Sequence, residues 1–173
     1  MKTIKLNVKT KAKNYPIYFG DNILNQTGKL IKKNLPDVKK ISIITDSKLP
    51  KKLLTKLVRS LKSYDVNLFK LTANERNKSL TVANKIIQHL LKKNFNRSDC
   101  LIAFGGGVLG DLSAFISSLT KRGIKFVNIP TTLLAQVDAS IGGKTGINSD
   151  QGKNLIGTFY QPDFIISDPI VLK

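Results

Sequence analysis

Residues 100–130 read CLIAFGGGVLGDLSAFISSLTKRGIKFVNIP. The run Cys100–Phe104 is short and apolar, and a glycine cluster follows it, which predicts a buried strand that ends in a tight turn. A helix is predicted from about Val108 to Thr120, and Ile124–Ile129 is a second apolar strand, closed by a proline. Strand, helix and strand in this order form a crossover unit, in which the two strands run parallel.

The same alternation continues on both sides of this unit. Ile4–Val8 and Tyr15–Phe19 alternate like paired strands and predict a β-hairpin. Further strands are predicted over Lys40–Thr45, Val66–Leu71 and Phe164–Ser167, and further helices over Asn22–Lys33, residues 53–61, Ser79–Lys93 and Thr132–Ser140. The sequence indicates one α/β domain over residues 1–173 that is Rossmann-like, with a mostly parallel sheet and an N-terminal β-hairpin. Ligands bind such sheets at the carboxyl ends of their strands.

The composition is strongly basic, with a formal net charge of +18 and a pI near 10.1. The lysines are spread from Lys2 to Lys173 in runs of no more than two, without interleaved aromatic residues. Arginine, the usual reader of bases, occurs only as Arg59, Arg76, Arg97 and Arg122. We interpret the lysines as solvated surface residues and expect no nucleic-acid partner, while a field this positive attracts small anionic substrates.

Cysteine content and hydropathy indicate the compartment. Cys100 is the single cysteine, so no internal disulfide forms, and its apolar surroundings favour a buried strand residue over a nucleophile. No apolar stretch approaches the roughly 20 residues that span a bilayer. The N-terminus also lacks the apolar core of a signal peptide. We expect a cytoplasmic protein with no membrane partner.

The glycine cluster after the first quoted strand satisfies G-x-G-x-x-G through Gly105, Gly107 and Gly110. Glycines there let the backbone approach a pyrophosphate, which then lies on the N-terminus of a helix. In dinucleotide folds this pattern usually follows the first strand, and an acidic ribose partner comes about 20 residues later. Here that region reads FVNIPT, so Asp46, which ends the strand KISIIT, and Asp111 are the available acceptors for hydroxyl groups.

A second cluster, Gly142–Thr145, reads GGKT and resembles a P-loop, but that motif needs glycine at the position of Asp138. We therefore exclude a P-loop. Thr131 and Thr132 follow a strand, where they either cap the next helix or contact a ligand.

Charged residues follow these turns. Arg122, Lys144 and Lys153 are expected to gather near one edge, where three cations suit a ligand with both a phosphate and a carboxylate. The closeness of Asp138 to Lys144 favours a role in the same site. The helix that carries Asp138 is expected to turn its apolar residues inward: Leu133, Leu134 and Val137.

A metal site is not expected from the residues themselves. His89 is the only histidine, and it lies in the middle of a predicted helix beside Leu90 and Leu91, so we interpret it as structural. No cluster of residues has the spacing of metal ligands.

Three long motifs carry a family resemblance. Residues 105–123 (GGGVLGDLSAFISSLTKRG), 129–148 (IPTTLLAQVDASIGGKTGIN) and 152–162 (GKNLIGTFYQP) resemble, in order and spacing, the 3-dehydroquinate synthases, sugar-phosphate cyclases of the shikimate pathway. The segments ITDS (44–47) and NERNKSL (74–80) match more loosely. The resemblance covers essentially the whole chain, as the N-terminal, NAD-binding half of the family.

The resemblance implies a lyase of aromatic amino acid biosynthesis that converts 3-deoxy-arabino-heptulosonate 7-phosphate into 3-dehydroquinate and phosphate. NAD is implied as a transient cofactor: the substrate is oxidised, phosphate is eliminated, the carbonyl is reduced again, and the ring opens and closes by an aldol step. A divalent metal, zinc or cobalt, is implied as a Lewis acid. The full-length form is implied to be a homodimer.

By position, the resemblance implies that Asp46 contacts the adenosine ribose. The rest of the cofactor site is implied to comprise Ala73, Asn74, Glu75, Arg76, Asn77, Lys78, Gly106, Gly107, Val108, Leu109, Gly110, Asp111, Thr131, Thr132, Lys144, Lys153, Val171, Leu172 and Lys173. The substrate is implied to meet Arg122, Asp138, Lys144 and Asn154. Asn74 stands where the family usually has glycine, and Ala73 stands where it usually has an acidic residue.

The family's metal ligands, a glutamate and two histidines, are implied to lie in a helical C-terminal domain that is missing from these residues, so no metal ligand is expected here. We therefore expect weak NAD binding at best, and no turnover, from this chain alone. The alternatives are another sugar-phosphate cyclase, a metal-dependent alcohol or glycerol dehydrogenase, and a non-catalytic module that binds anions through its charge. The dehydrogenases typically carry serine at the position of Val108.

Overall fold

The computed structural model describes residues 3–172, which form a seven-stranded sheet and a separate two-stranded sheet. The large sheet contains β1 (Ile4–Val8), β2 (Tyr15–Phe19), β3 (Lys40–Asp46), β4 (Asp65–Leu71), β5 (Cys100–Gly105), β6 (Lys125–Pro130) and β9 (Phe164–Ser167). The α-helices are α1 (Thr27–Asn34), α2 (Lys51–Ser60), α3 (Leu80–Lys92) and α4 (Gly107–Leu119). The small sheet pairs β7 (Ile147–Ser149) with β8 (Gly152–Ile156).

The strand order is β1-β2-β9-β6-β5-β3-β4, and all neighbours are parallel except β1 and β2, which are antiparallel. This order confirms the Rossmann-like α/β class with an N-terminal hairpin. The chain leaves β3 for the outer strand β4 and then returns to β5 on the other side of β3. The winding therefore changes direction between β3 and β5, and open parallel sheets bind ligands at the carboxyl ends beside such a change.

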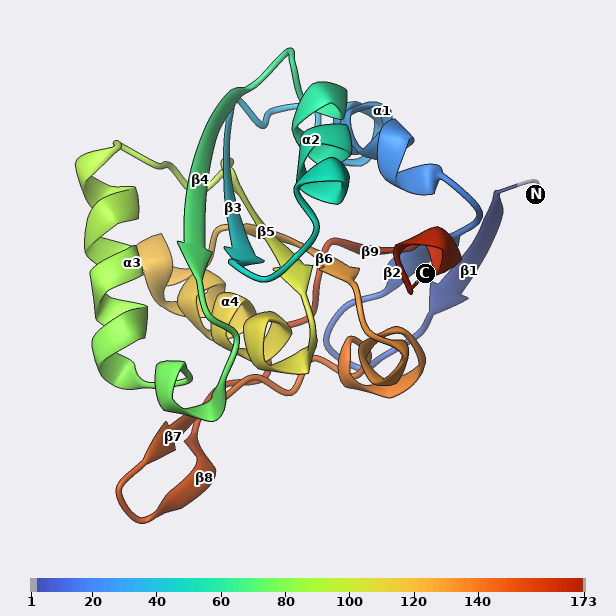
Figure 1. The fold of residues 1–173 in the computed structure, drawn as a ribbon. Helices are drawn as coiled ribbons and strands as arrows, with labels where there is room; N and C mark the ends of the chain where they lie inside the picture. Colours follow the sequence, from blue (N-terminus) through green and yellow to red (C-terminus); the bar gives the residue numbers. More distant parts are fainter. Residues whose placement is uncertain (1–2, 173) are drawn as a thin grey trace.

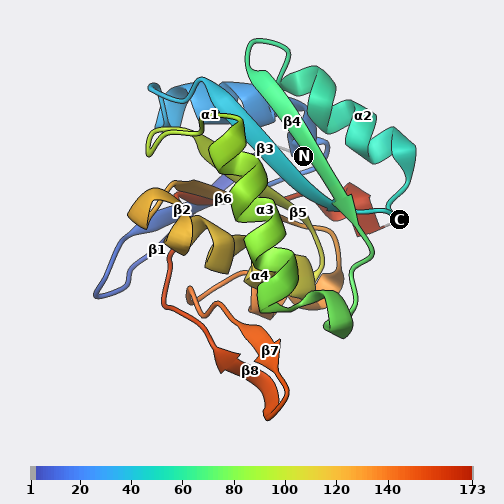
Figure 2. The same ribbon diagram turned by 90° about the vertical axis from the view of Figure 1, so that its left-hand side faces the viewer.

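Helices cover both faces of the sheet, with α1 and α2 on one face and α3 and α4 on the other (Figures 1 and 2). Alternate strand residues divide between these layers. Ile41 and Ile43 of β3 belong to the core beneath α1 and α2, whereas Ile44 belongs to the core beneath α3 and α4. Because both faces are covered, the central strands read as continuous apolar runs, which is why the sequence predicted them well.

The predicted helix over Asn22–Lys33 is divided in the structure. A 3₁₀ turn over Ile23–Gln26 precedes α1. The two carboxylate oxygens of Asp168 accept hydrogen bonds from the backbone N–H groups of Asn22 and Leu24, both at 3.1 Å. This side chain from the far end of the sequence holds the first turn in place, and the local pattern could not show it.

The segment after β6 is helical, as expected, but its large apolar side chains face solvent and not the core. Ala135–Ala139 form a π-helical turn, in which the Ser140 N–H donates to the Ala135 carbonyl at 3.1 Å. Leu133, Leu134 and Val137 are 65%, 68% and 66% exposed, so the expectation that they point inward is wrong. The wide turn departs from the 3.6-residue period and buries the small Ala135 instead.

Candidate functional site

Four strand ends meet at one edge of the large sheet. The carboxyl ends of β4, β3, β5 and β6 lie side by side in that order, and their arrows point toward the lower part of Figure 1. Asp46 ends β3, Ala73 follows β4, Gly106 follows β5 and Thr131 follows β6. The fold thus brings together residues that the sequence assigned to a cofactor from four separate segments, and their contacts with that cofactor stay predictions.

The turn between β5 and α4 has the features of an anion site. The N–H groups of Leu109 and Gly110 donate to the Gly106 carbonyl, and within residues 3–172 no side chain caps the start of α4, where Gly107 and Val108 lie. A Cβ added at Gly107 would make one ordinary van der Waals contact, with the Ala139 Cβ at 3.4 Å, so this residue is not crowded by its surroundings. A helix N-terminus that is neither capped nor crowded fits the pyrophosphate of NAD.

Two other glycines of the motif have packing roles. A Cβ at Gly110 would lie 3.2 Å from Asn128 Nδ2 of β6, and one at Gly106 would lie 3.2 Å from Thr132 Cγ2. Gly110 thus lets α4 lie close to β6, and Gly106 lets the turn before α4 lie close to the segment after β6. Thr132 Oγ1 accepts a hydrogen bond from the Ala135 N–H at 3.3 Å, which is the capping role considered for it.

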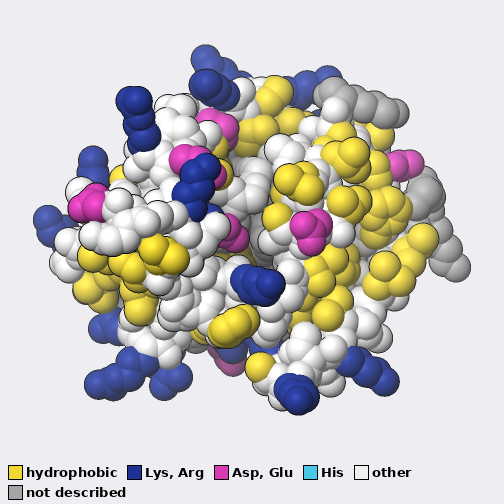
Figure 3. Space-filling model, turned by 90° about the horizontal axis from the view of Figure 1, so that it is seen from below, with side chains coloured by type: hydrophobic (Ala, Val, Ile, Leu, Met, Phe, Trp, Pro, Cys, Tyr) yellow, Lys and Arg dark blue, Asp and Glu magenta, His cyan; other side chains and the backbone are white. Residues whose placement is uncertain are grey.

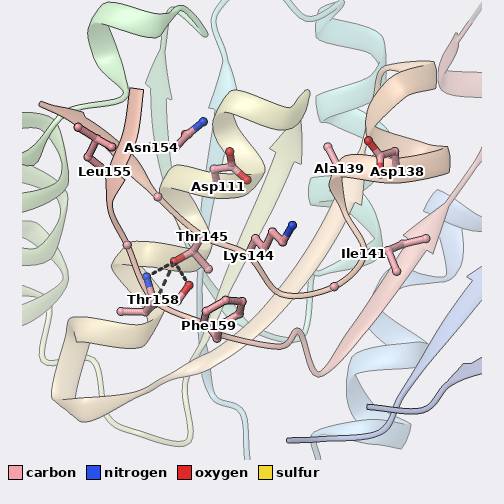
Figure 4. A pocket seen from close by; sticks show the side chains of 13 residues that line it. Asp111, Asp138, Ala139, Ile141, Lys144, Thr145, Asn154, Leu155, Thr158 and Phe159 are labelled. Carbon is pink, nitrogen blue, oxygen red and sulfur yellow. Dashed lines mark hydrogen bonds between the residues drawn. The ribbon is translucent and has the colours of Figure 1, made fainter. Parts of the chain in front are cut away.

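A cavity of 740 Å³ adjoins this turn. Figure 4 shows side chains from four segments around it: Asp111 from α4, Asp138 from the π-helical turn, Lys144 from the following loop and Asn154 from β8. Glycines 142, 146 and 157 and the side chain of Phe159 complete much of its wall. One cation and two carboxylates around a cavity can hold an anionic, hydroxyl-bearing ligand and transfer its protons.

Lys78 is the buried polar centre of this site. Its side chain is 4% exposed, and its Nζ donates to Asp111 Oδ2 and to Asn154 Oδ1, both at 2.5 Å. Burial raises the pKa of Asp111 above its ordinary value, and the hydrogen bond from Lys78 opposes that rise. Because Lys78 precedes α3, Asp111 lies in α4 and Asn154 lies in β8, one ammonium group joins three segments.

The loop before Lys78 does not need a glycine. Asn74 has a φ of −144°, which is extended backbone, and its side chain accepts a hydrogen bond from the Asn77 N–H at 2.9 Å. Asparagine therefore fits this position without strain and begins the short 3₁₀ turn over Glu75–Asn77.

Asn148 was not among the predicted site residues, although it bonds to two of them. Its Nδ2 donates to Glu75 Oε2 at 2.7 Å, and its Oδ1 accepts from the Asn154 N–H at 3.1 Å. The hydrogen bond from Asn148 is the main cause that lowers the pKa of Glu75. The only signal in the sequence was its place at the end of the second quoted motif.

Arg122 lies at the opposite edge of the sheet. Because α4 runs back toward the amino ends of the strands, its 13 residues carry the chain about 20 Å away from the glycine turn. Arg122 there shares a separate hollow with Lys13 and Asp163, which are paired at 2.8 Å. Within one chain, the expectation that Arg122 gathers with Lys144 and Lys153 is therefore wrong. The contact of Arg122 with a substrate stays a prediction.

The predicted cofactor residues near the C-terminus have mixed surroundings. Val171 is 7% exposed and packs into the core beneath α1 and α2, whereas Leu172 is 39% exposed. Lys173 lies outside the described residues. Lys153 is exposed on β8. The roles assigned to these residues stay predictions.

Metal-ligating side chains do not cluster in the part of the chain that the structure describes: no group of three or more His, Cys, Asp or Glu could hold an ion. The His89 ring lies edge-on to Phe69 with the ring centroids 6.0 Å apart, a packing contact.

Cys100 is buried, as expected, and burial raises the pKa of its thiol well above the ordinary value. Within residues 3–172, no helix is both long and apolar enough to cross a membrane.

Hydrophobic side chains gather beside the cavity. In Figure 3, which views the carboxyl edge of the sheet, they cover one half of the face, and a hollow with charged side chains lies near its centre. Leu133, Leu134, Val137 and Phe159 are each 65% to 80% exposed. Apolar surfaces of this kind mark contact sites.

Comparison with known sequences agrees with these features. A family model described as 3-dehydroquinate synthase N-terminal matches residues 68–173. A 3-dehydroquinate synthase from Pelagibacter ubique is 51% identical over 168 residues, which cover 97% of this chain and 46% of that protein. One from Campylobacter concisus is 44% identical over 170 residues, or 98% of this chain and 46% of that protein. The chain thus spans about half the length of the curated relatives it matches.

Solved structures share the fold. A 2-deoxy-scyllo-inosose synthase complexed with carbaglucose-6-phosphate, NAD+ and Co2+ has a TM-score of 0.89 at 23% identity, covering 98% of this chain and 47% of that one. A 2-epi-5-epi-valiolone synthase from Streptomyces hygroscopicus with NAD+ and Zn2+ bound has a TM-score of 0.79 at 26% identity, covering 95% and 45%. A glycerol dehydrogenase from Schizosaccharomyces pombe has a TM-score of 0.68 at 22% identity, covering 90% and 37%.

Proposed function

This chain belongs to the 3-dehydroquinate synthase family, and we propose that it is the NAD-binding part of an enzyme that forms 3-dehydroquinate and phosphate from 3-deoxy-arabino-heptulosonate 7-phosphate. The observation that carries this proposal is the N-terminus of α4, which no side chain caps and where Gly107 is not crowded by its surroundings. It stands next to a cavity lined by Asp138, Lys144 and Asn154, so a cofactor and an anionic substrate can lie side by side.

In this proposal the chain supplies binding and orientation. The N–H groups of the first turn of α4 bind the pyrophosphate, and Asp46 accepts a hydrogen bond from a ribose hydroxyl. Lys144 offsets the charge of the substrate, and Asn154 orients its hydroxyl groups by hydrogen bonding, while the Asp138 carboxylate accepts a hydrogen bond or a proton from one of them. Bound NAD supplies a hydride acceptor that is restored within one turnover, so the overall reaction involves no net oxidation.

The described residues do not fit the metal that the family resemblance implies, because they contain no group of three ligating side chains. We propose that the metal ligands belong to the part of the longer relatives that this chain does not span. The exposed apolar surface beside the cavity supports a contact with such a part. The chain alone is therefore expected to bind NAD weakly and to form no product.

A thermal-shift titration with NAD tests this proposal. Ligand at about 100 times its dissociation constant stabilises the folded state by about 2.7 kcal/mol. For a chain of this size that corresponds to a rise in Tm of roughly 5–10 °C. A coupled assay for 3-dehydroquinate with the isolated chain should show no turnover.

The alternative functions predict other results. Net accumulation of NADH with glycerol or a simple alcohol would support a dehydrogenase, whose fold this chain shares. Salt-dependent binding of duplex DNA without any NAD shift would support an anion-binding module. Turnover of a different sugar phosphate, once the chain is part of a complete enzyme, would support another cyclase.

A further inference from the structure

The β7–β8 hairpin projects from the body of the molecule below α3 and α4 (Figures 1 and 2). Its own ladder is short, with Ile147 paired to Ile156 and Ser149 paired to Gly152 across an irregularity. Most of β8 is exposed. Because an isolated two-stranded hairpin is marginally stable in water, contacts at its base must hold it in place.

Asn148 provides the polar part of that base. Its Nδ2 donates to Glu75 Oε2 at 2.7 Å and to the Glu75 carbonyl at 3.1 Å. Its backbone N–H donates to the Lys78 carbonyl at 2.7 Å. Its Oδ1 accepts the Asn154 N–H at 3.1 Å. A single side chain therefore joins the loop before α3 to both strands of the hairpin.

Only an amide suits this position. One end of the side chain donates to two acceptors of Glu75, and the other end accepts from the backbone of Asn154, so both donor and acceptor atoms are required. A carboxylate would keep the acceptor, lose the donors and oppose the negative charge of Glu75. An aliphatic side chain would lose both kinds of bond.

The hydrogen bonds of Asn148 also affect side chains at the cavity. Asn154 has a φ of 59°, a left-handed conformation that asparagine tolerates but that needs support from its surroundings. The bond from its N–H to Asn148 gives that support. Its own Oδ1 then accepts from Lys78, whose Nζ also binds Asp111. The position of Asn148 thus affects three residues around the cavity.

We propose that Asn148 is a positioning residue: together with Glu75 it forms a clasp that holds the β7–β8 hairpin against the loop before α3 and thereby fixes Lys78 and Asn154 in the site. The effect on the hairpin follows from the contacts alone. The effect on NAD binding rests on the proposed function.

The test compares Asn148→Asp with wild type by amide hydrogen exchange of residues 147–156. Near neutral pH the introduced carboxylate lies beside Glu75, so the clasp opens and exchange should become at least about tenfold faster than in wild type. As the pH falls, one of the two carboxyl groups takes up a proton, although the nearby Lys78 and Lys153 ammonium groups oppose this, and the ratio of the two rates should move back toward one. Asn25→Asp makes the same charge change at an exposed position on another part of the molecule and should leave hairpin exchange unchanged.

A substitution of Glu75 distinguishes loss of the Asn148–Glu75 hydrogen bonds from general destabilisation of the fold. Glu75→Gln alone keeps an acceptor for Asn148 and should keep the hairpin protected. In the double variant Glu75→Gln/Asn148→Asp, the introduced amide donates to the introduced carboxylate, so protection should return near neutral pH. Wild-type exchange in Asn148→Asp, or no rescue in the double variant, would overturn the clasp.

The affinity for NAD shows whether Asn148 also positions Lys78 and Asn154 in the site. If wild type binds NAD, Asn148→Asp should weaken that binding about tenfold near neutral pH. Because Glu75 belongs to the predicted cofactor site, the double variant is compared with Glu75→Gln alone and should bind NAD about as tightly as that variant. If wild type does not bind NAD, the proposed function fails while the exchange experiment still decides the clasp. Faster exchange with unchanged NAD affinity would show that Asn148 supports the hairpin only and would overturn its positioning role.

Discussion

Lys78 is almost fully buried, which is unusual for a lysine. The carboxylate and amide oxygens that accept from its Nζ come 33 and 76 residues later in the chain. The family motifs could place Lys78, Asp111 and Asn154 in one site. They could not show that these residues bond to one another, because that pairing depends on how α4 and the hairpin fold around the loop. Asn148 was missed for the same reason: a polar residue in a loop has no local pattern that reveals its partners.

Tyr160 gives a residue-scale prediction about pH. Its hydroxyl donates to the Ile124 carbonyl at 2.6 Å, and burial, together with the nearby Asp163 carboxylate, raises its pKa to about 12. The folded state keeps the phenol proton in a range where the unfolded state loses it. The unfolded state then binds fewer protons, so stability should fall by up to about 1.4 kcal/mol per pH unit as the pH rises from about 10 toward 12.

Urea unfolding of Tyr160→Phe and wild type measures this effect. At neutral pH the variant should be about 1 kcal/mol less stable, because it lacks the hydrogen bond to Ile124. Its deficit should shrink as the pH rises above about 10. A deficit that stays constant across this range would contradict the assigned pKa of Tyr160.

Elements differ in how well the sequence predicts them. The parallel strands were predicted closely because covered strands are continuous apolar runs, and α3 because its capping residue Ser79 and its apolar face are both visible in the sequence. The β7–β8 hairpin was not predicted, since its exposed strands carry no apolar alternation. The predicted orientation of the Ala135–Ala139 turn was also wrong. The prediction assumed that the apolar residues of this segment face the core, whereas they lie on an exposed surface beside a cavity.

Gly28 gives a prediction at the scale of packed helices. A Cβ at Gly28 of α1 would clash with the backbone carbonyl oxygen of Ser60, which ends α2. Because a backbone atom cannot rotate away, Gly28→Ala should force α1 and α2 apart and cost about 1–3 kcal/mol in the free energy of unfolding.

The control is a glycine-to-alanine change in another helix. At Gly107 the added Cβ has room, so Gly107→Ala should leave stability unchanged or raise it by up to about 1 kcal/mol. Thermal unfolding of both variants checks the contrast. Equal Tm values for Gly28→Ala and wild type would show that the two helices are not as closely packed as the structure has them.

At the scale of the whole molecule, three features agree with one another. The positive net charge attracts anions, the carboxyl edge of the sheet gathers a free helix N-terminus and a polar cavity, and the chain spans about half the length of its curated relatives. The general fold could be predicted from the order of strands and helices. The opposite positions of Arg122 and Lys144 could not, because they depend on the direction in which α4 crosses the sheet.

A calorimetric titration of NAD into wild type and Gly107→Ala tests whether NAD binds at the N-terminus of α4. Wild type should bind one NAD per chain, and Gly107→Ala should bind it at least about tenfold more weakly at an undiminished Tm, because the added methyl group occupies the space for the pyrophosphate. No binding heat with wild type, or equal affinity in the two proteins, would show that NAD does not bind at this helix N-terminus.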